Sequence, residues 1–584
     1  MTELRAINPE NTDAIRYDTF THREVTILLV FSFATVVFLG LIFYPTTLED
    51  AFITFRYGKH FAEGYGFGAW NRTGQHVEGY TSPLWMVLVG LFNRAGVDPQ
   101  IVSKALGVFS HLMLTSILVL FPVFPKKPSQ SPHDLLANSN VAVIAGVFLA
   151  LYLPMSWYAT SGMETVFFSA LICLAVIALR LPHSTLTLSA LGVLLILTRP
   201  EGALIGFAGF ALAWQQGKRN RQNLHPVYIS ACVSFITLAA LLLSRILLFG
   251  EVLPNTYWAK VSGAGFQHVR FGLKYFFDWM TNHGVLCLLT FLTILSLFTT
   301  QRNDKFREMQ TQFGFILFLL LVYLAYILKV GGDNYSAFPY WRHFVHLAPL
   351  IGLLACYSIT TMYPTRRYVQ LSVLSVAIAA TNAPILSVVH QNVTLKHAIY
   401  DRLQTGLKLS LKEHNAYFIW LKGITDSNTI IASSIGGELP YVVDAVHIDI
   451  LGLNTRHIAK NGSFDPNGPV DSKTDMKWVL EQRPDMIEGY ISATEIISGV
   501  PFEKHLHNSR YQMNVGLVTS PIFQQEYMFV LNAPYVELDR ALFARRSWWL
   551  KHPMKDKIDC IPVAETTLAL FGVRSQSKLG EGGN

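Results

Sequence analysis

Residues 25–50 read VTILLVFSFATVVFLGLIFYPTTLED and decide the class of fold. The first twenty, Val25 to Tyr44, are almost wholly apolar, and about twenty such residues make a helix that crosses the hydrocarbon core of a bilayer. Three arginines precede the run and no small-residue cleavage site follows it, so we interpret it as a retained signal anchor. An acidic pair, Glu49 and Asp50, comes directly after it.

The composition of the whole chain agrees with a membrane protein. Of its 584 residues, 51% are hydrophobic and only 15% are charged, against about 25% charged residues in a soluble domain. This excludes a disordered chain, a coiled coil and a collagen. The net charge of +7 is small for this length and indicates no nucleic-acid partner, and the five cysteines have no spacing of a disulfide framework.

Ten further apolar runs follow, which predicts eleven crossings in all. The runs are 25–44, 101–121, 138–155, 163–179, 184–198, 200–214, 226–249, 283–300, 313–328, 343–362 and 368–388. With residues 1–24 inside, the inner loops hold 14 Lys and Arg in 72 residues and the outer segments hold 10 in 111. The positive-inside rule therefore supports this topology.

A shorter run, Ser82 to Phe92, is interpreted as an interfacial helix, because a crossing there would move Lys126 and Lys127 to the outer side. The sequence thus predicts a membrane domain at 25–390, whose first outer loop is 45–100. Residues 391–584 alternate short apolar segments with turns and predict an extracytoplasmic α/β or α+β domain.

Ionisable residues concentrate at the predicted outer ends of the crossings. Carboxylates at membrane depth are costly and usually face a functional cavity. Those on this side are Glu49, Asp50, Glu78, Glu164, Glu201 and Asp333. The cations on the same side are Arg199, Lys260, Arg342 and His343.

Each cluster also has a plain structural explanation. Glu49, Asp50 and Glu164 suit helix N-termini, where acids are favoured. Arg199 and Glu201 could pair with each other at the tip of a broken hairpin formed by 184–198 and 200–214. The functional alternative for the acidic pair is a helix from Asp50 to Glu63 at the lipid surface. Its spacing would bring Asp50, Thr54 and Tyr57 to one face and would suit a lipid-anchored anionic substrate.

The ordered set of motifs resembles a known family. The pieces are EDAFITFRYGKHFAEGYGFGAWN (49–71), VEGYTSPLW (77–85), SGMETVFF (161–168), LTRPEGALI (197–205), VLPNTYWAK (252–260), VGGDNY (330–335) and IGGELPYVVDAVHIDILGLNTRHIA (435–459). Together they resemble polytopic glycosyltransferases of the GT-C superfamily, in particular the AftB-type terminal arabinofuranosyltransferases.

The resemblance implies transfer of a single sugar, by this analogy arabinofuranosyl, from a polyprenyl-phosphate donor. Asp50 matches the family's general base, while Glu49 replaces the usual first aspartate. Other matching positions are the basic-aromatic pair Arg56 and Tyr57, the loop residues Glu78, Tyr80 and Thr81, Asn255 in the VLPNTYWAK piece, and Asp449 in the outer-domain signature. Asp449 could bind the acceptor, although it could equally fix a turn.

The expected chemistry needs one base for the acceptor hydroxyl and cations for the departing phosphate. Arg199, Lys260, Arg342 or His343 could supply this positive charge on the outer side. A single base predicts inversion at the sugar carbon, because retention needs a second carboxylate as nucleophile. A divalent ion (Mg²⁺, Mn²⁺ or Ca²⁺) held through Glu49 and Asp50 stays open.

The expected partners are membrane lipids, the lipid-linked donor and a glycan, glycolipid or protein acceptor of the cell envelope. The expected location is the bacterial inner membrane, with the N-terminus cytoplasmic and the C-terminal domain periplasmic. Two alternatives share the lipid-linked substrate: a transporter or flippase, and an outer-facing glycan ligase or polymerase. Transporters commonly carry internal repeats, and none is evident here.

Overall fold

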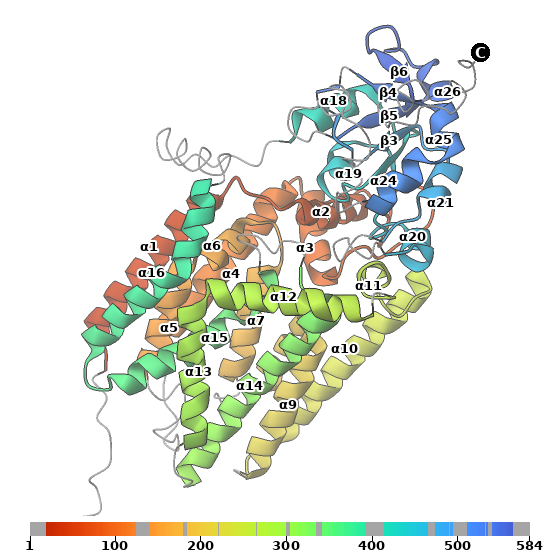
Figure 1. Ribbon diagram of the computed structural model, residues 1–584. Helices are drawn as coiled ribbons and strands as arrows, with labels where there is room; N and C mark the ends of the chain where they lie inside the picture. The colour runs from red at the N-terminus through yellow and green to blue at the C-terminus, as the bar shows by residue number, and fades with distance from the viewer. Residues whose placement is uncertain are drawn as a thin grey trace, which may run out of the picture.

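The protein consists of a helical bundle and an α/β domain at one end of it (Figure 1). The structure is a computed structural model. It describes residues 19–123, 139–178, 184–219, 221–263, 265–299, 304–333, 341–391, 414–464, 473–489, 491–493, 511–531, 533–534 and 540–563. Most of the predicted segment 1–24 and the start of the predicted outer domain lie outside these residues.

Within the described residues, each apolar run predicted from the sequence contains a helix. The long elements of the bundle are α1 (His22–Phe43), α4 (Pro99–Leu120), α5 (Ser139–Leu151), α6 (Leu153–Thr160), α7 (Thr165–Ala178), α8 (Thr185–Thr198), α9 (Gly202–Arg219), α10 (His225–Phe249), α13 (Gly284–Thr299), α14 (Asp304–Val330), α15 (Arg342–Met362) and α16 (Arg367–Gln391). Within the described residues, five helices are long and apolar enough to cross a membrane, and seven are if each of two bent pairs counts as one. The chain is therefore mostly helical, with the helices of a membrane protein.

The run predicted as one crossing at 138–155 is broken instead. Helices α5 and α6 meet at a bend of 60°. Pro154 explains the break, because it occupies the first turn of α6, has no backbone N–H and cannot continue the hydrogen bonding of α5.

Four shorter helices lie where the bundle meets the α/β domain (Figure 1). They are α2 (Glu49–Ala62), α3 (Pro83–Arg94), α11 (Asn255–Lys260) and α12 (Phe266–Asn282), which is bent by 97° from α13. The predicted helix after the acidic pair and the predicted interfacial helix are thus both present. The prediction that the first of them lies at the lipid surface is wrong, since Ala51 to Gly58 of α2 are buried against α3 and the C-terminal domain.

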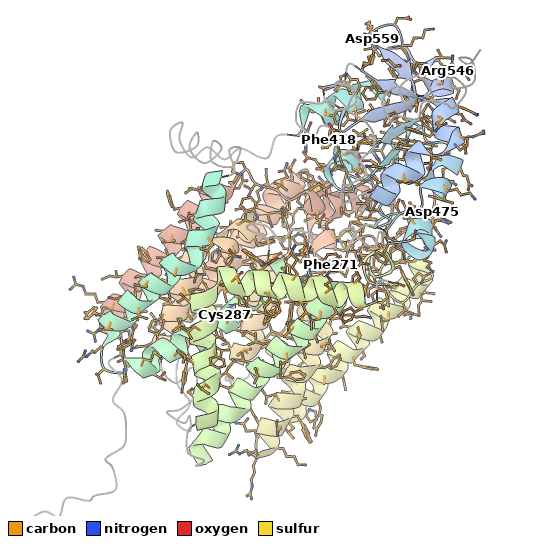
Figure 2. All side chains as sticks on the ribbon, viewed as in Figure 1. Phe271, Cys287, Phe418, Asp475, Arg546 and Asp559 are labelled. Carbon is orange, nitrogen blue, oxygen red and sulfur yellow. The ribbon has the colours of Figure 1, made fainter. Side chains whose placement is uncertain are left out.

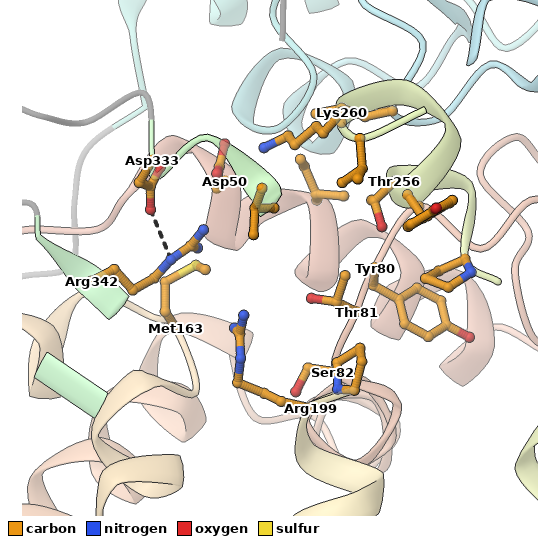
Figure 3. Close-up of a pocket in the computed structure, with 18 of the residues that line it drawn as sticks. Asp50, Tyr80, Thr81, Ser82, Met163, Arg199, Thr256, Lys260, Asp333 and Arg342 are labelled. Atoms are coloured by element: carbon orange, nitrogen blue, oxygen red, sulfur yellow. Dashed lines mark ion pairs between the residues drawn. The ribbon is translucent and has the colours of Figure 1, made fainter. Parts of the chain in front are cut away.

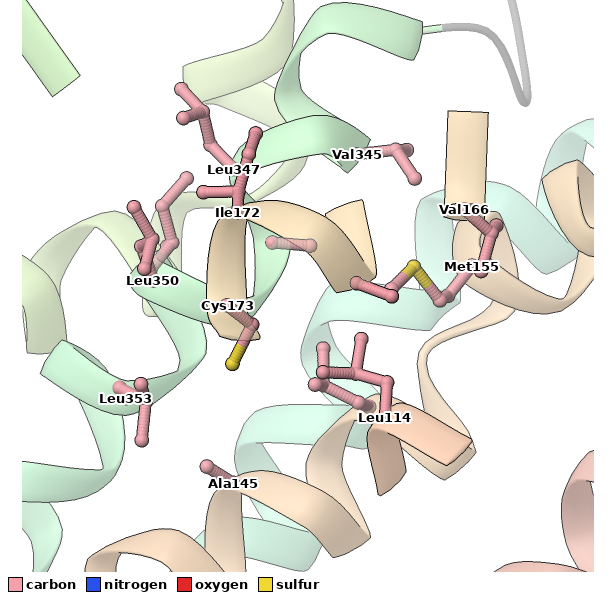
Figure 4. Packing of buried hydrophobic residues seen from close by; sticks show 14 of the residues in the cluster. Leu114, Ala145, Met155, Val166, Ile172, Cys173, Val345, Leu347, Leu350 and Leu353 are labelled. Carbon is pink, nitrogen blue, oxygen red and sulfur yellow. The ribbon is translucent and has the colours of Figure 1, made fainter. Parts of the chain in front are cut away.

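The core of the bundle surrounds α15, of which 89% of the most apolar window is buried. Figure 4 shows Leu350 and Leu353 of α15 close to Ile172 and Cys173 of α7. The bundle reaches outward to α10, of which only 17% is buried and which exposes Phe235 and Leu247. An apolar exposed face of this kind suits contact with lipid.

The C-terminal domain is built on one six-stranded mixed sheet. The strands are β1 (Ile430–Ser433), β2 (Val446–Asp449), β3 (Met486–Glu488), β4 (Tyr527–Val530), β5 (Leu542–Arg545) and β6 (Cys560–Pro562), in the order β2-β1-β3-β5-β4-β6. Strand β1 pairs in parallel with β2 and β3, and the other pairings are antiparallel. Figure 2 shows Asp475, Arg546 and Asp559 on this domain and Cys287 within the bundle.

The helices of this domain are short. They are α18 (Ala416–Ile424), α19 (Glu438–Val442), α20 (Arg456–Asn461), α21 (Met476–Glu481), α24 (Tyr511–Val518), α25 (Pro521–Glu526) and α26 (Arg546–Trp549). Helix α19 packs on α2, and α20 packs on α11. Because α19 follows β1 and α20 follows β2, the carboxyl ends of these parallel strands face the bundle.

Candidate active site

A cavity of about 220 Å³ lies between the end of the bundle and the C-terminal domain. Its wall comes from the start of α2, the loop 79–82, the segment before α7, the tip between α8 and α9, α11, the end of α14, the start of α15, and Leu453 of the C-terminal domain. Predicted site residues in this wall are Asp50, Tyr80, Thr81, Glu164, Arg199, Lys260, Asp333, Arg342 and His343. Figure 3 shows this arrangement.

The two acids at the start of α2 point to different places. Asp50 lines the cavity. Glu49 instead accepts hydrogen bonds from the backbone N–H groups of Gly437 and Glu438, where α19 begins, with 3.2 Å to the second. Burial, and then the charge of Asp50, raises the pKa of Glu49 to about 8. Glu49 therefore joins the two domains and does not face the cavity.

A divalent ion held through Glu49 and Asp50 stays a prediction, and of the two acids only Asp50 lines the cavity. Within the described part of the chain, no three His, Cys, Asp or Glu side chains are grouped to hold an ion. No chemical step is therefore assigned to a metal here.

Two arginines of the cavity are already paired with carboxylates. Arg342 Nε lies 2.9 Å from Asp333 Oδ2. Arg199 lies between two acids, with Nη1 2.5 Å from Glu164 Oε1 and Nε 2.6 Å from Glu201 Oε1. The expected Arg199–Glu201 pair is thus present and is extended by Glu164, while Glu201 lies behind the wall.

Lys260 differs from these arginines. Across the described residues, no ion pair or hydrogen bond involves its ammonium. Figure 3 shows it extending from α11 toward the Asp50 side of the cavity. Unlike the two arginines, Lys260 can therefore bind an anionic ligand without first breaking an ion pair with a carboxylate.

The loop that forms the opposite wall is anchored at both ends. Glu78 forms a two-pronged pair with Arg245 of α10, with distances of 2.8 and 3.0 Å. Ser82 Oγ donates to the Thr198 carbonyl at 2.7 Å. Glu78 itself lies behind the wall that Tyr80 and Thr81 form.

Sequence reasoning missed Arg245, although a signal was present. It is the single charged residue within the apolar run 226–249, where a charge usually has a partner and a role. It also missed Tyr326, a cavity residue from within the run 313–328. Tyr326 carried no comparable signal, because tyrosine is common in such helices.

Three predicted residues hold the C-terminal domain and do not line the cavity. Arg56 donates to the carbonyls of Pro440 and Ala445. Tyr57 donates to Asn454 Oδ1 at 3.0 Å, and Asn255 donates to the carbonyls of Gly452 and Leu453, both at 2.8 Å. The helical spacing that grouped Tyr57 with Asp50 does not bring both into the cavity.

Asp449 fixes a turn, which was the structural alternative to a role in binding the acceptor. Its carboxylate accepts from the backbone N–H groups of Leu451 at 3.0 Å and Asn454 at 2.9 Å, and from the Asn454 amide at 3.0 Å. Asn454 in turn accepts from Tyr57, so Asp449 shapes the loop that carries Leu453 into the cavity wall.

No protein-family model, no curated protein and no solved structure matches this chain.

Proposed function

We propose that the protein is a membrane glycosyltransferase that moves a single sugar from a polyprenyl-phosphate donor to an acceptor of the cell envelope. The observation that carries the proposal is the carboxylate of Asp50 in a small cavity whose other walls carry Arg199, Lys260 and Arg342. A base and a set of cations around one space suit a reaction that removes a proton from a hydroxyl and releases a phosphate.

Asp50 is the proposed general base. It takes the proton of the acceptor hydroxyl as that oxygen attacks the sugar carbon. A base in this position contributes typically 10²–10⁴-fold to the rate. Glu49 is turned toward Gly437, and the other carboxylates of the wall, Glu164 and Asp333, are paired with arginines. This supports inversion at the sugar carbon, because retention needs a second carboxylate as nucleophile.

The charges of the cavity support Lys260 as the first contact of the phosphate. Arg342 and Arg199 are engaged by Asp333, Glu164 and Glu201. A phosphate entering beside Lys260 meets an unpaired ammonium, and the remaining N–H groups of both arginines can then stabilise the charge that develops on the leaving oxygen.

The size of the cavity supports transfer of one sugar and not of a whole glycan. About 220 Å³ is less than the ~300–1,000 Å³ of a pocket for a drug-sized ligand. The proposal includes a donor sugar, which is arabinofuranosyl by the analogy above. It also includes the acceptor, which is a glycan, a glycolipid or a surface protein.

The proposal includes eleven crossings in the bacterial inner membrane, with a cytoplasmic N-terminus and a periplasmic C-terminal domain. It is supported by a helix at each predicted run and by the grouping of α2, α3, α11, α12 and the cavity at one end of the bundle. The cavity then faces the outer side, where the acceptors are.

The test is sugar release from a panel of synthetic polyprenyl-phosphate monosaccharides by the purified full-length protein, with an envelope extract as acceptor. We expect one donor to be used by the wild type and Asp50→Asn to lose at least 10²-fold in rate while it still binds that donor. Asp278→Asn on α12, outside the cavity, is the matched control. A parallel reaction with chelator measures the dependence on a divalent ion.

Full activity of Asp50→Asn would remove Asp50 from the mechanism. Binding of a donor without release of any sugar from the panel would contradict the transferase and favour transport or transfer of a whole glycan.

A further inference from the structure

Three threonine hydroxyls of the cavity wall take no part in the steps proposed above. They belong to Thr54 of α2, Thr81 of the loop Glu78–Ser82 and Thr256 of α11, and all three residues line the same cavity. Figure 3 shows Thr81 and Thr256 across the cavity from Arg342, with their hydroxyls directed into the space between. We call Thr54, Thr81 and Thr256 the hydroxyl wall.

Hydrogen bonds hold the three segments of the hydroxyl wall side by side. The backbone N–H of Gly79 donates to Tyr57 Oη at 3.1 Å, which joins the loop to α2. The backbone N–H of Asn255 donates to the Glu78 carbonyl at 2.9 Å, which joins α11 to the loop. Each threonine of the wall lies within three positions of one of these bonds. The hydroxyls are therefore placed by the backbone before any ligand enters.

The hydroxyls of the wall are available to a ligand. Among the described residues, no hydrogen bond involves any of the three. Threonines in the helices of this bundle commonly donate to the carbonyl four residues earlier, as Thr115 and Thr198 do at 2.8 and 2.6 Å. Thr54 does not, although its own helix offers such a carbonyl. Each hydroxyl of the wall can thus both donate and accept a hydrogen bond.

The hydroxyl wall lies beside both the proposed base and the proposed phosphate contact. Thr54 follows Asp50 by one turn of α2, and Lys260 follows Thr256 by one turn of α11. Residues four apart on a helix have Cβ atoms about 5–6 Å apart. The ring of a donor is therefore within reach of the wall when its phosphate contacts Lys260 and its reacting carbon faces Asp50.

The chemistry of the hydroxyl wall favours a neutral sugar. A threonine hydroxyl and a sugar hydroxyl have the same capacity to donate one hydrogen and to accept, so they can pair in either direction. A carboxylate or an ammonium on the sugar would need a partner of opposite charge when it leaves water. Threonine offers no such charge, and Arg199 and Arg342 already engage carboxylates.

We propose that the hydroxyl wall binds the sugar ring of the donor and selects a neutral sugar through its hydroxyls. This binding rests on the proposed function, because the sugar-bearing lipid is the substrate of that reaction. Binding is measured without turnover, so a failure of the hydroxyl wall and a failure of the transferase give different results.

The first experiment titrates the purified full-length protein with two lipids. One is the polyprenyl-phosphate monosaccharide of the synthetic panel that binds most tightly, and the other is polyprenyl phosphate without a sugar. The variants are Thr54→Val, Thr81→Val and Thr256→Val, which each remove one hydroxyl and keep the shape of the side chain. We expect each variant to raise the Kd of the sugar-bearing lipid roughly 3- to 10-fold, as is typical for the loss of one hydrogen bond, and to leave the Kd of the sugar-free lipid unchanged.

Two controls frame this result. Thr281→Val on α12, outside the cavity, should bind both lipids as the wild type does. Lys260→Met, which removes the proposed phosphate contact, should raise both Kd values. An unchanged Kd of the sugar-bearing lipid in all three wall variants would overturn the proposal. An equal rise for both lipids would overturn it too, because the threonines would then shape the cavity without contacting the sugar.

The second experiment uses monodeoxy forms of the same donor, each lacking one sugar hydroxyl. If Thr256 binds one of these hydroxyls, the deoxy donor that lacks it should bind wild type and Thr256→Val with Kd values equal within about twofold, because the contact is already lost. The other deoxy donors should still bind Thr256→Val more weakly than the wild type. A substitution that weakens every deoxy donor alike would show a general effect on the cavity and would overturn the contact.

Selection of a neutral sugar is tested with a polyprenyl-phosphate uronate, which we expect to bind no more tightly than the sugar-free lipid. Tighter binding of the uronate would overturn this selection. Sugar-dependent binding that the wall variants weaken, without release of sugar by the wild type, would contradict the proposed function and support the sugar site. Sugar release by wall variants with wild-type affinity would support the transferase and overturn the sugar site.

Discussion

Glu49 and Asp50 are adjacent, yet their side chains lie in different environments, because successive residues of a helix point about 100° apart. Asp50 faces the cavity and Glu49 meets the start of α19. The distinction explains why only one of the two acids is proposed as the base.

The raised pKa of Glu49 makes the stability of the protein depend on pH. Its pKa is about 8 in the folded chain and 4.5 as its ordinary value, so its neutral form is favoured by folding. The contribution is complete below about pH 4.5 and is lost as the pH rises through 8. We expect the thermal unfolding temperature of the wild type to fall between pH 5 and pH 9. The free energy of unfolding should fall by less than about 1.4 kcal/mol per pH unit, because Glu49 keeps some solvent contact.

Glu49→Gln should flatten this dependence, since the amide keeps an oxygen for the N–H groups of Gly437 and Glu438 and does not ionise. Glu63→Gln at the other, exposed end of α2 is the control. Equal slopes in all three proteins would show that Glu49 does not titrate in this range.

Lys260 is the residue on which donor affinity should depend most directly. Lys260→Met removes the unpaired ammonium, and hydrogen bonds to charged groups are worth about 1.5–3 kcal/mol. We therefore expect the Kd of a polyprenyl-phosphate sugar to rise roughly 10- to 100-fold, measured by titration of the purified protein. Lys274→Met, on the exposed face of α12, should bind as the wild type does. Unchanged affinity in Lys260→Met would assign the phosphate to the arginines.

At the scale of single residues, the sequence indicated the ionisable wall of the cavity but not which residues lie behind it. Asp50, Lys260 and Arg342 could be named because charges at the ends of apolar runs need water or partners. The sequence could not show that Arg56 and Tyr57, unlike these three residues, lie outside the cavity. Their surroundings depend on a domain that begins more than 300 residues later, and helical periodicity does not tell which domain covers a face.

Among the elements, the loop Glu78–Ser82 is held at its first residue by a buried ion pair with Arg245. Glu78 and Arg245 are 3% and 5% exposed, and burial raises the pKa of Glu78 even beside the guanidinium. Removing one member of such a pair leaves a buried charge alone and typically costs about 3–5 kcal/mol.

Arg245→Met should therefore destabilise the protein more than the double variant Glu78→Gln with Arg245→Met, measured by thermal unfolding in lipid nanodiscs. Arg270→Met on α12, which lies outside the cavity, is the matched single-arginine control. A double variant less stable than either single variant would show that the two side chains support the fold separately.

The long helices were predictable because an apolar run of about twenty residues has few other structures open to it. The bends between helices were harder to predict from the sequence. Pro154 could mark the α5–α6 break, but the turn between α12 and α13 has no proline and rests on packing. Helix α12 lies between the predicted crossings 226–249 and 283–300, in a segment for which the sequence analysis predicted no helix.

At the scale of the whole molecule, the C-terminal domain forms part of the cavity and is not an appendage. In open sheets with parallel strands, ligands commonly bind at the carboxyl ends where the strand order reverses. Here the carboxyl ends of β1 and β2 meet α2 and α11, and Leu453 joins the cavity wall. This edge of the sheet thus packs against the bundle and completes the cavity wall.

Two glycines allow this close approach. A Cβ at Gly79 would lie 1.9 Å from Asn454 Oδ1, and one at Gly437 would lie 2.0 Å from the backbone oxygen of Glu49. The first obstacle is a side chain that can turn away. The second is backbone at the start of α2, so a methyl group at Gly437 forces α19 and α2 apart.

We therefore expect Gly437→Ala to lower transfer activity at least tenfold and to expose the C-terminal domain to limited proteolysis, since α2 carries the proposed base and overpacking of this kind costs typically 1–3 kcal/mol. Gly423→Ala, in the same domain with no atom within 4 Å of the added methyl, should behave as the wild type. Gly437→Ala with wild-type proteolysis and normal activity would mean that the domain docks without fixing α2. A domain that is released while activity persists would mean instead that the bundle alone holds Asp50 in place, and the cavity would then not need Leu453.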